Sequence, residues 1–146
     1  MLKTIFAFLS FLLLVGCASY IEDYKAEVFF HSKDKCFDSA ISVLENMKIT
    51  VKKKDKKKMI IISNLGVVNI AAAQYERIER LETQAKYFIK VTGDEHFCKI
   101  DVYNLVVVSR GRVTKMNELS ATWANDHALA PLFERINLQL NEEDYR

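Results

Sequence analysis

The chain contains three cysteines, Cys17, Cys36 and Cys98, and their positions suggest two kinds of thiol chemistry. Cys17 ends a segment with a basic start and an almost unbroken apolar run over residues 5–15. A basic start, an apolar stretch and a small residue before the cut are typical of a secretory signal peptide. The run is shorter than the roughly 20 apolar residues that span a bilayer. We therefore expect residues 1–16 to be a cleaved signal and not a transmembrane helix.

The residues around the cut, Leu14-Val15-Gly16-Cys17, resemble the lipobox of bacterial lipoproteins. The resemblance implies a thioether-linked diacylglycerol on Cys17, cleavage before it and acylation of the new amine. Several acyl chains hold a protein on a membrane stably, whereas one chain holds it reversibly. Ala18 stands where an Asp would favour the inner membrane, so the resemblance implies a lipid anchor on the periplasmic face of the outer membrane. The alternative for Cys17 is an ordinary thiol near an ordinary signal-peptidase site.

Cys36 and Cys98 remain once Cys17 is lipidated. The compartment beyond the inner membrane is oxidising, which makes a pair of exported cysteines a candidate disulfide. The alternative is two separate buried thiols, because free cysteine often behaves as a small apolar residue.

A dense run of lysines surrounds Asp55 and is the sharpest charge feature of the chain. It consists of Lys52, Lys53, Lys54, Lys56, Lys57 and Lys58. It could be the solvated tip of a β-hairpin, where lysines discourage pairing between sheet edges. It could also contact anions, either phosphate groups of a lipid or glycolipid or the acidic surface of a protein partner.

Catalytic and metal-binding patterns are missing from the sequence. His31, His96 and His127 fall in three different segments, and no motif of a serine hydrolase, zinc protease, phosphate loop or dinucleotide site is present. Only His96 and Cys98 have a spacing typical of metal ligands. We expect Asp126-His127 to start a helix. The sequence thus predicts no catalytic residue, no metal and no cofactor.

Composition restricts the remaining function classes. The 146 residues carry 21 basic and 19 acidic side chains, a formal net charge of +2, and half of the residues are hydrophobic. A nucleic-acid binder would normally carry a basic excess, so we expect no nucleic-acid partner. With four glycines and one proline, the chain is suited to one folded domain. We assign residues 17–27 to a lipidated tether and 28–146 to a single domain.

The first half of this domain shows clear periodicities. We expect an edge strand near Val28–Phe30, and then a helix capped by Ser32 with Asp34 in its first turn. Its apolar stripe consists of Phe37, Ala40, Ile41, Leu44 and Met47. Alternating residues over 48–64, with the lysine run between two apolar strands, predict a β-hairpin.

The second half is less uniform. Gly66 indicates a turn, and residues 65–84 allow either an amphipathic helix or a strand near Ile78–Leu81. Residues 86–91 and 98–108 predict two antiparallel strands joined by a short turn. We expect a polar loop over Val113–Ala124, and then a helix that starts near Asn125 or Asp126 or is shifted by Pro131. Its core stripe comprises Leu129, Leu132, Phe133, Ile136 and Leu140.

These elements predict an α+β two-layer sandwich, with about four antiparallel strands and two helices on one face. The segment Asp34–Val51 resembles the opening of small outer-membrane lipoproteins with a BamC-like fold, and the layout agrees over residues 28–140. The resemblance implies a helix-covered antiparallel sheet and a non-enzymatic accessory role beside envelope assembly machinery.

The predicted faces bring the two remaining cysteines together. Cys98 shares its strand face with Ile100 and Val102, and Cys36 lies on the flank of the helical stripe that should cover this sheet. Both thiols then point into one helix–sheet interface. This favours the disulfide, which would close a loop of roughly 60 residues.

The sequence therefore predicts a lipid-anchored, non-enzymatic binding module for an envelope protein or an anionic glycolipid. An immunity or inhibitor lipoprotein and a small-ligand carrier are the alternatives.

Overall fold

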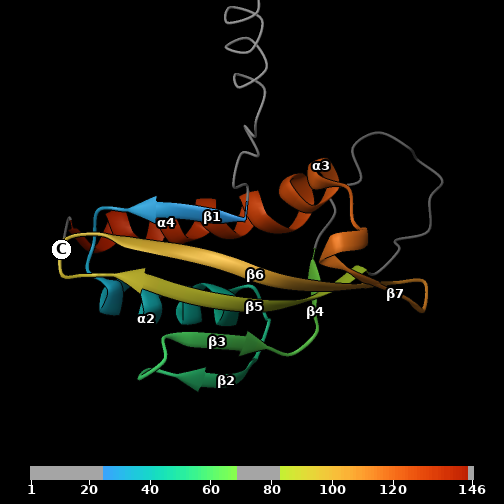
Figure 1. The fold of residues 1–146 in the computed structure, drawn as a ribbon, viewed down its shortest axis with the longest axis horizontal. Coiled ribbons are helices and arrows are strands. Elements are labelled where there is room, and N and C mark those ends of the chain that lie inside the picture. Colours follow the sequence, from blue (N-terminus) through green and yellow to red (C-terminus); the bar gives the residue numbers. More distant parts are fainter. Residues whose placement is uncertain (1–24, 69–82, 145–146) are drawn as a thin grey trace, which may run out of the picture.

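Seven antiparallel strands form one sheet in the computed structural model, which describes residues 25–68 and 83–144 (Figure 1). The strands are β1 (Ala26–Phe29), β2 (Val51–Asp55), β3 (Ile60–Ser63), β4 (Gly66–Val68), β5 (Thr83–Gly93), β6 (Cys98–Ser109) and β7 (Arg112–Lys115). Their order is β1-β6-β5-β3-β2, while β4 also pairs with β5 and β7 with β6. The expected count of about four strands was wrong, because β4 and β7 were not foreseen and the expected edge strand, β1, also belongs to this sheet.

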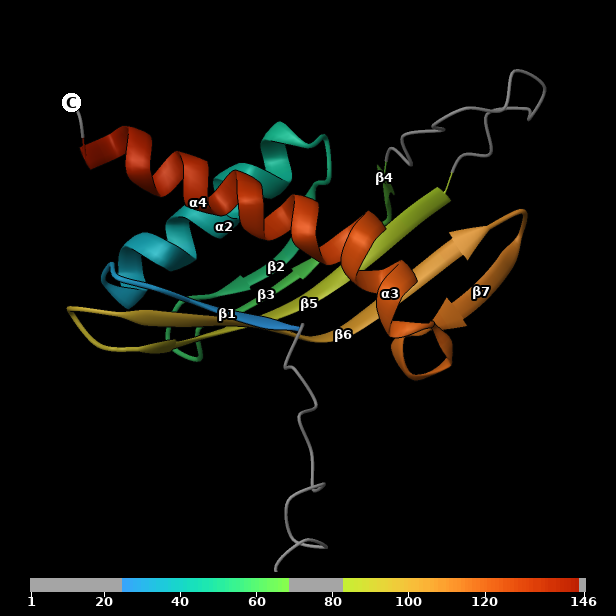
Figure 2. The ribbon, with the colours of Figure 1, turned by 90° about the horizontal axis from the view of Figure 1, so that it is seen from above.

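Two long helices cover one face of this sheet, α2 (Lys33–Asn46) and α4 (Ala130–Asp144), and they also pack against each other (Figure 2). The antiparallel sheet with helices confirms the mixed α and β composition of the predicted fold. The buried side chains of β5 and β6 alternate with partly exposed ones, so that one face of each strand lies under the helices.

The start and end of α2 follow local chemistry. The Ser32 side chain accepts a hydrogen bond from the backbone N–H of Lys35 at 3.3 Å, which confirms the predicted N-cap. At the other end Lys48 takes a left-handed conformation with φ of 63°, which stops the helix. Ile49 then enters the core with no exposed surface. The chain thus turns back, and β2 runs beside the helix that precedes it.

A glycine stands at or just before the start of both missed strands, β4 and β7. Arg110 and Gly111 both have positive φ, which is the geometry of a two-residue hairpin turn, so β6 returns directly as β7. Gly66 is the first residue of β4 and not a turn. A Cβ atom on it would lie 2.5 Å from Cγ1 of Ile49, so the glycine permits this close packing. β1 includes two residues that the sequence assigned to the tether.

The predicted loop over Val113–Ala124 was also wrong. It contains β7, a 3₁₀ turn (Met116–Glu118) and the short helix α3 (Ala121–Ala124), capped by Ser120. A wide π turn (Asn125–Leu129) joins α3 to α4, so the C-terminal helical segment begins earlier than expected. Pro131 explains this turn, because proline lacks the N–H and crowds the carbonyl of a regular helix.

The apolar stripe predicted for the last helix is confirmed. Its five members, Leu129, Leu132, Phe133, Ile136 and Leu140, are all buried. Residues 69–82, which include the segment that could have been a helix or a strand, lie outside the described part of the chain.

Candidate binding groove beside the lysine hairpin

The predicted disulfide is present. Cys36 of α2 and Cys98 of β6 are bonded, with Cα atoms 6.5 Å apart, and both residues are completely buried. The bond lies next to a second attachment of the same helix end, a hydrogen bond from the N–H of Lys33 to the carbonyl of Asp94 at 2.8 Å. The first turn of α2 is therefore fixed to the β5–β6 turn.

The β5–β6 turn is itself held by the Asp94 side chain. Its carboxylate accepts hydrogen bonds from the backbone N–H groups of His96 at 2.7 Å and Phe97 at 3.1 Å. These two donors hold the pKa of Asp94 below its usual range. The anchor point of α2 is thus a closed turn and not a loose loop.

The lysine hairpin, which comprises β2, β3 and the turn over residues 56–59, forms one end of the strand order. Three lysines lie on β2 and three in the turn, and all six are exposed: Lys52, Lys53, Lys54, Lys56, Lys57 and Lys58. Asp55 closes the turn by accepting a hydrogen bond from the N–H of Lys58 at 3.0 Å. The predicted exposed hairpin tip is confirmed, and its contact with anions stays a prediction.

A groove of about 490 Å³ opens between α2 and this hairpin; we call it the α2–β2 groove. The residues that line it are Phe37, Asp38, Ile41, Ser42, Glu45, Lys54 and Lys56. Five of them come from one flank of α2 at helical spacing, and two come from the hairpin. Phe37 is buried and Ile41 partly buried, so the groove has apolar contact surface between charged rims.

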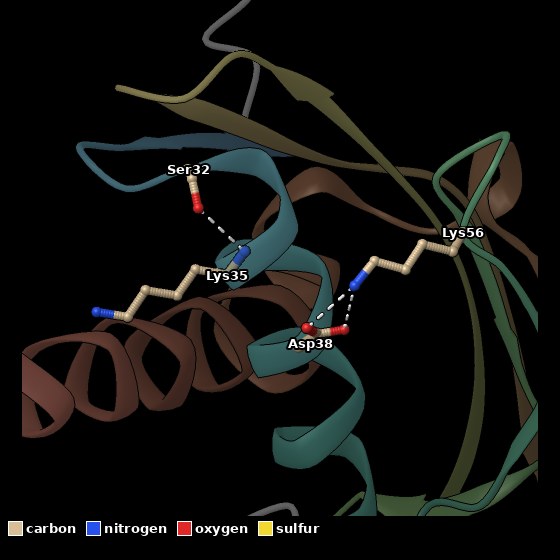
Figure 3. A network of polar contacts seen from close by, with 4 residues as sticks. All are labelled: Ser32, Lys35, Asp38 and Lys56. Atoms are coloured by element: carbon tan, nitrogen blue, oxygen red, sulfur yellow. Dashed lines mark hydrogen bonds and ion pairs between the residues drawn. The ribbon is translucent and has the colours of Figure 1, made fainter.

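One ion pair crosses from the hairpin to the helix. The ammonium of Lys56 lies 3.2 Å from both carboxylate oxygens of Asp38 (Figure 3). The same ammonium lies 5.9 Å from the centre of the Phe37 ring, within the range of a cation–π contact. Both partners of the ion pair are more than half exposed, so the pair is weak and can exchange for another anion.

The sequence predicted the lysines but missed the helix side of this groove. Phe37 and Ile41 were assigned to the core stripe, and Asp38, Ser42 and Glu45 received no role. Their spacing of i, i+1, i+4, i+5 and i+8 places them on one flank of a helix, and this pattern could have identified them. The spacing does not indicate which strand lies beside that flank.

The structure describes some, but not all, of the other residues to which the sequence assigned a role. Cys17 lies outside the described residues. Among the residues that the structure describes, no group of three or more His, Cys, Asp or Glu side chains is arranged to hold a metal ion. None of the helices in this part of the chain is long and apolar enough to cross a membrane. Asp126 and His127 lie in the π turn, with the His127 ring 5.2 Å from that of Trp123.

Among known proteins, the chain is distantly similar to solved structures. No protein-family model and no curated protein matches the chain. Among solved structures, it is similar to a DUF4468 family protein from Bacteroides ovatus ATCC 8483. The two share 17% sequence identity and a TM-score of 0.42, over 82% of this chain and 80% of that one.

Proposed function

We propose that this chain is a non-enzymatic binding module of the bacterial envelope, anchored by lipid on Cys17 to the periplasmic face of the outer membrane. The Cys36–Cys98 disulfide carries the proposal, because such bonds persist in oxidising compartments and are rare in the cytosol. It agrees with the predicted export signal and the lipobox-like residues before Ala18.

The lysine hairpin supplies the binding surface in this proposal. Six exposed ammonium groups on one hairpin attract an anionic partner, either an envelope protein or a glycolipid. The α2–β2 groove beside it is open at the surface and has both apolar and charged walls. A partner that covers the groove and the hairpin together fits this surface better than a small ligand enclosed in a core.

The anchor is tested by metabolic labelling with a clickable fatty-acid analogue. The wild-type protein should take up the label, and Cys17→Ser should not. Cys36→Ala/Cys98→Ala is the matched control, because it removes the other two cysteines and should keep the label. Label retained in Cys17→Ser would disprove lipidation at this residue.

The binding role is tested by crosslinking in intact cells, followed by purification of the chain. Wild type is compared with a variant in which Lys53, Lys54, Lys56 and Lys57 are replaced by Gln. We expect a crosslinked species that is lost or strongly reduced in the variant. The same species at the same yield in both would show that the lysine hairpin does not bind the partner.

A further inference from the structure

The outer side of β2 is an edge of the sheet in the described part of the chain, where β2 pairs with β3 alone. An edge strand presents a row of N–H and C=O groups that another extended chain can pair with. Proteins often bind peptides by adding them as a strand at such an edge. The edge of β2 therefore offers backbone hydrogen-bond donors and acceptors to a peptide, in addition to the charged lysine side chains.

The groove supplies what a peptide needs besides main-chain hydrogen bonds. α2 runs beside β2, and the groove between them exposes part of Ile41 next to the Phe37 ring. Side chains of an added strand would point alternately to the helix side and to the opposite face. Those on the helix side would enter the groove, where an apolar side chain can pack on Ile41.

The positive charge of the lysines on β2 favours an acidic peptide. Lys53 pairs in register with Ile62 and Lys54 with Ile61, so these two lysines lie on opposite faces of the hairpin. Acidic side chains on either face of an added strand would thus meet an ammonium group. The lysines also repel a second copy of this edge, because like charges would face each other.

We propose that the α2–β2 groove binds an extended acidic segment of a protein partner, which pairs with β2 as an additional strand. This inference rests on the proposed function, and it gives the chemistry of the partner. An apolar side chain of the segment packs on Ile41. A neighbouring carboxylate takes the Lys56 ammonium from Asp38, exchanging one exposed ion pair for another.

The test uses the complete chain, purified in detergent without reductant, and a fluorescent nine-residue peptide of alternating Glu and Val. A second peptide has the same sequence but carries N-methyl groups on alternate peptide bonds, which removes donors needed for strand pairing. A third peptide has Gln in place of Glu. Binding is followed by fluorescence anisotropy.

Two protein variants with the same change in charge separate the groove from the rest of the hairpin. Lys54→Gln/Lys56→Gln changes the two lysines that line the groove, and Lys57→Gln/Lys58→Gln changes two that do not. We expect the first variant to bind the Glu–Val peptide about fivefold more weakly than wild type, and the second to stay within about twofold. N-methylation of the peptide should weaken binding by about tenfold or more.

Each contrary result overturns a stated part of the inference. Equal binding of the methylated and unmethylated peptides would overturn strand addition. Equal weakening by both lysine pairs would overturn the groove as the site. Binding to vesicles of anionic phospholipid without any binding to the peptide would overturn the peptide partner, yet leave the anchored binding module in place. The Cys17 labelling experiment tests that module separately.

Discussion

The two flanks of helix α2 differ sharply although they belong to the same short segment. The core flank carries Cys36, Ala40 and Leu44, which have no exposed surface, and it is bonded to β6. The groove flank carries exposed Asp38 and partly buried Ser42, beside the groove of about 490 Å³. One helix thus serves both as part of the core and as the wall of an open groove.

The contrast shows how a weakly packed surface can still be well positioned. The ion pair that joins the groove flank to the hairpin, from Asp38 to Lys56, is exposed and therefore weak. The position of the groove flank is set from the other flank, by the disulfide and by the Lys33–Asp94 hydrogen bond. Because this wall of the groove is already fixed, it loses little conformational entropy when a ligand binds, and this favours affinity.

The largest effect is expected from the disulfide on the core flank. Cys36→Ala/Cys98→Ala should lower the free energy of unfolding by about 4 kcal/mol, because the bond closes a loop of 62 residues. Urea denaturation measures this value. Reductant should destabilise the wild-type protein by a similar amount and leave the variant unchanged. A wild-type protein that is indifferent to reductant would contradict the role of the bond.

A paired truncation compares the two flanks directly. Leu44→Ala removes a fully buried side chain and should cost about 3 kcal/mol of stability. Ile41→Ala removes a partly buried side chain at the groove and should cost about 1 kcal/mol. Chemical denaturation of both variants checks the difference. Equal losses would mean that the groove flank is packed as tightly as the core.

Tyr87 tests the core under the helices. Its hydroxyl donates a hydrogen bond to the Ala128 carbonyl at 3.1 Å, so Tyr87→Phe should cost about 1 kcal/mol. Burial raises the pKa of Tyr87, although Arg135 lowers it slightly. The buried hydroxyl therefore stays neutral in the folded protein while the unfolded chain ionises above about pH 10.

The sign of the pH effect follows from that raised pKa. The stability that neutral Tyr87 contributes is fully present below about pH 10 and is lost as the pH rises toward the folded-state pKa. The stability difference between wild type and Tyr87→Phe should therefore shrink above pH 10. Urea denaturation at a series of pH values from 8 to 11 measures it. A difference that stays constant over this range would contradict the prediction.

The smallest effect on stability is expected at the groove. Lys56→Gln removes the ion pair with Asp38 and should change the free energy of unfolding by less than about 0.5 kcal/mol, because both side chains are exposed. Thermal denaturation at low salt would reveal a larger value. A loss comparable with that of Leu44→Ala would show that the hairpin supports the core and is not a free binding surface.

Local patterns were sufficient to predict much of this protein. A serine before an apolar stripe gave the start of α2, and alternation gave the β2–β3 hairpin and the long strands β5 and β6. The buried stripe of α4 followed from helical spacing alone. These features are determined by the sequence because neighbouring residues decide them, through caps, turns and the period of the side chains.

Short strands and wide turns could not be predicted in the same way. β4 and β7 have three and four residues, too few for a period to appear, and they exist because β5 and β6 offer edges to pair with. The π turn has a local signal in Pro131, but the proline indicated only a shifted helix start and not the wider turn. In β4 and β7, packing against distant residues outweighs local preference.

The sequence by itself determined the chemistry of this protein: an apolar run before Cys17, two more cysteines and a run of lysines. It also placed Cys36 and Cys98 on faces that could meet, because each face follows from a local period. Only the tertiary structure decided that the lysines lie beside α2, since the left-handed turn at Lys48 returns β2 along the helix. A groove needs two walls, and their approach depends on contacts between segments that no local period records.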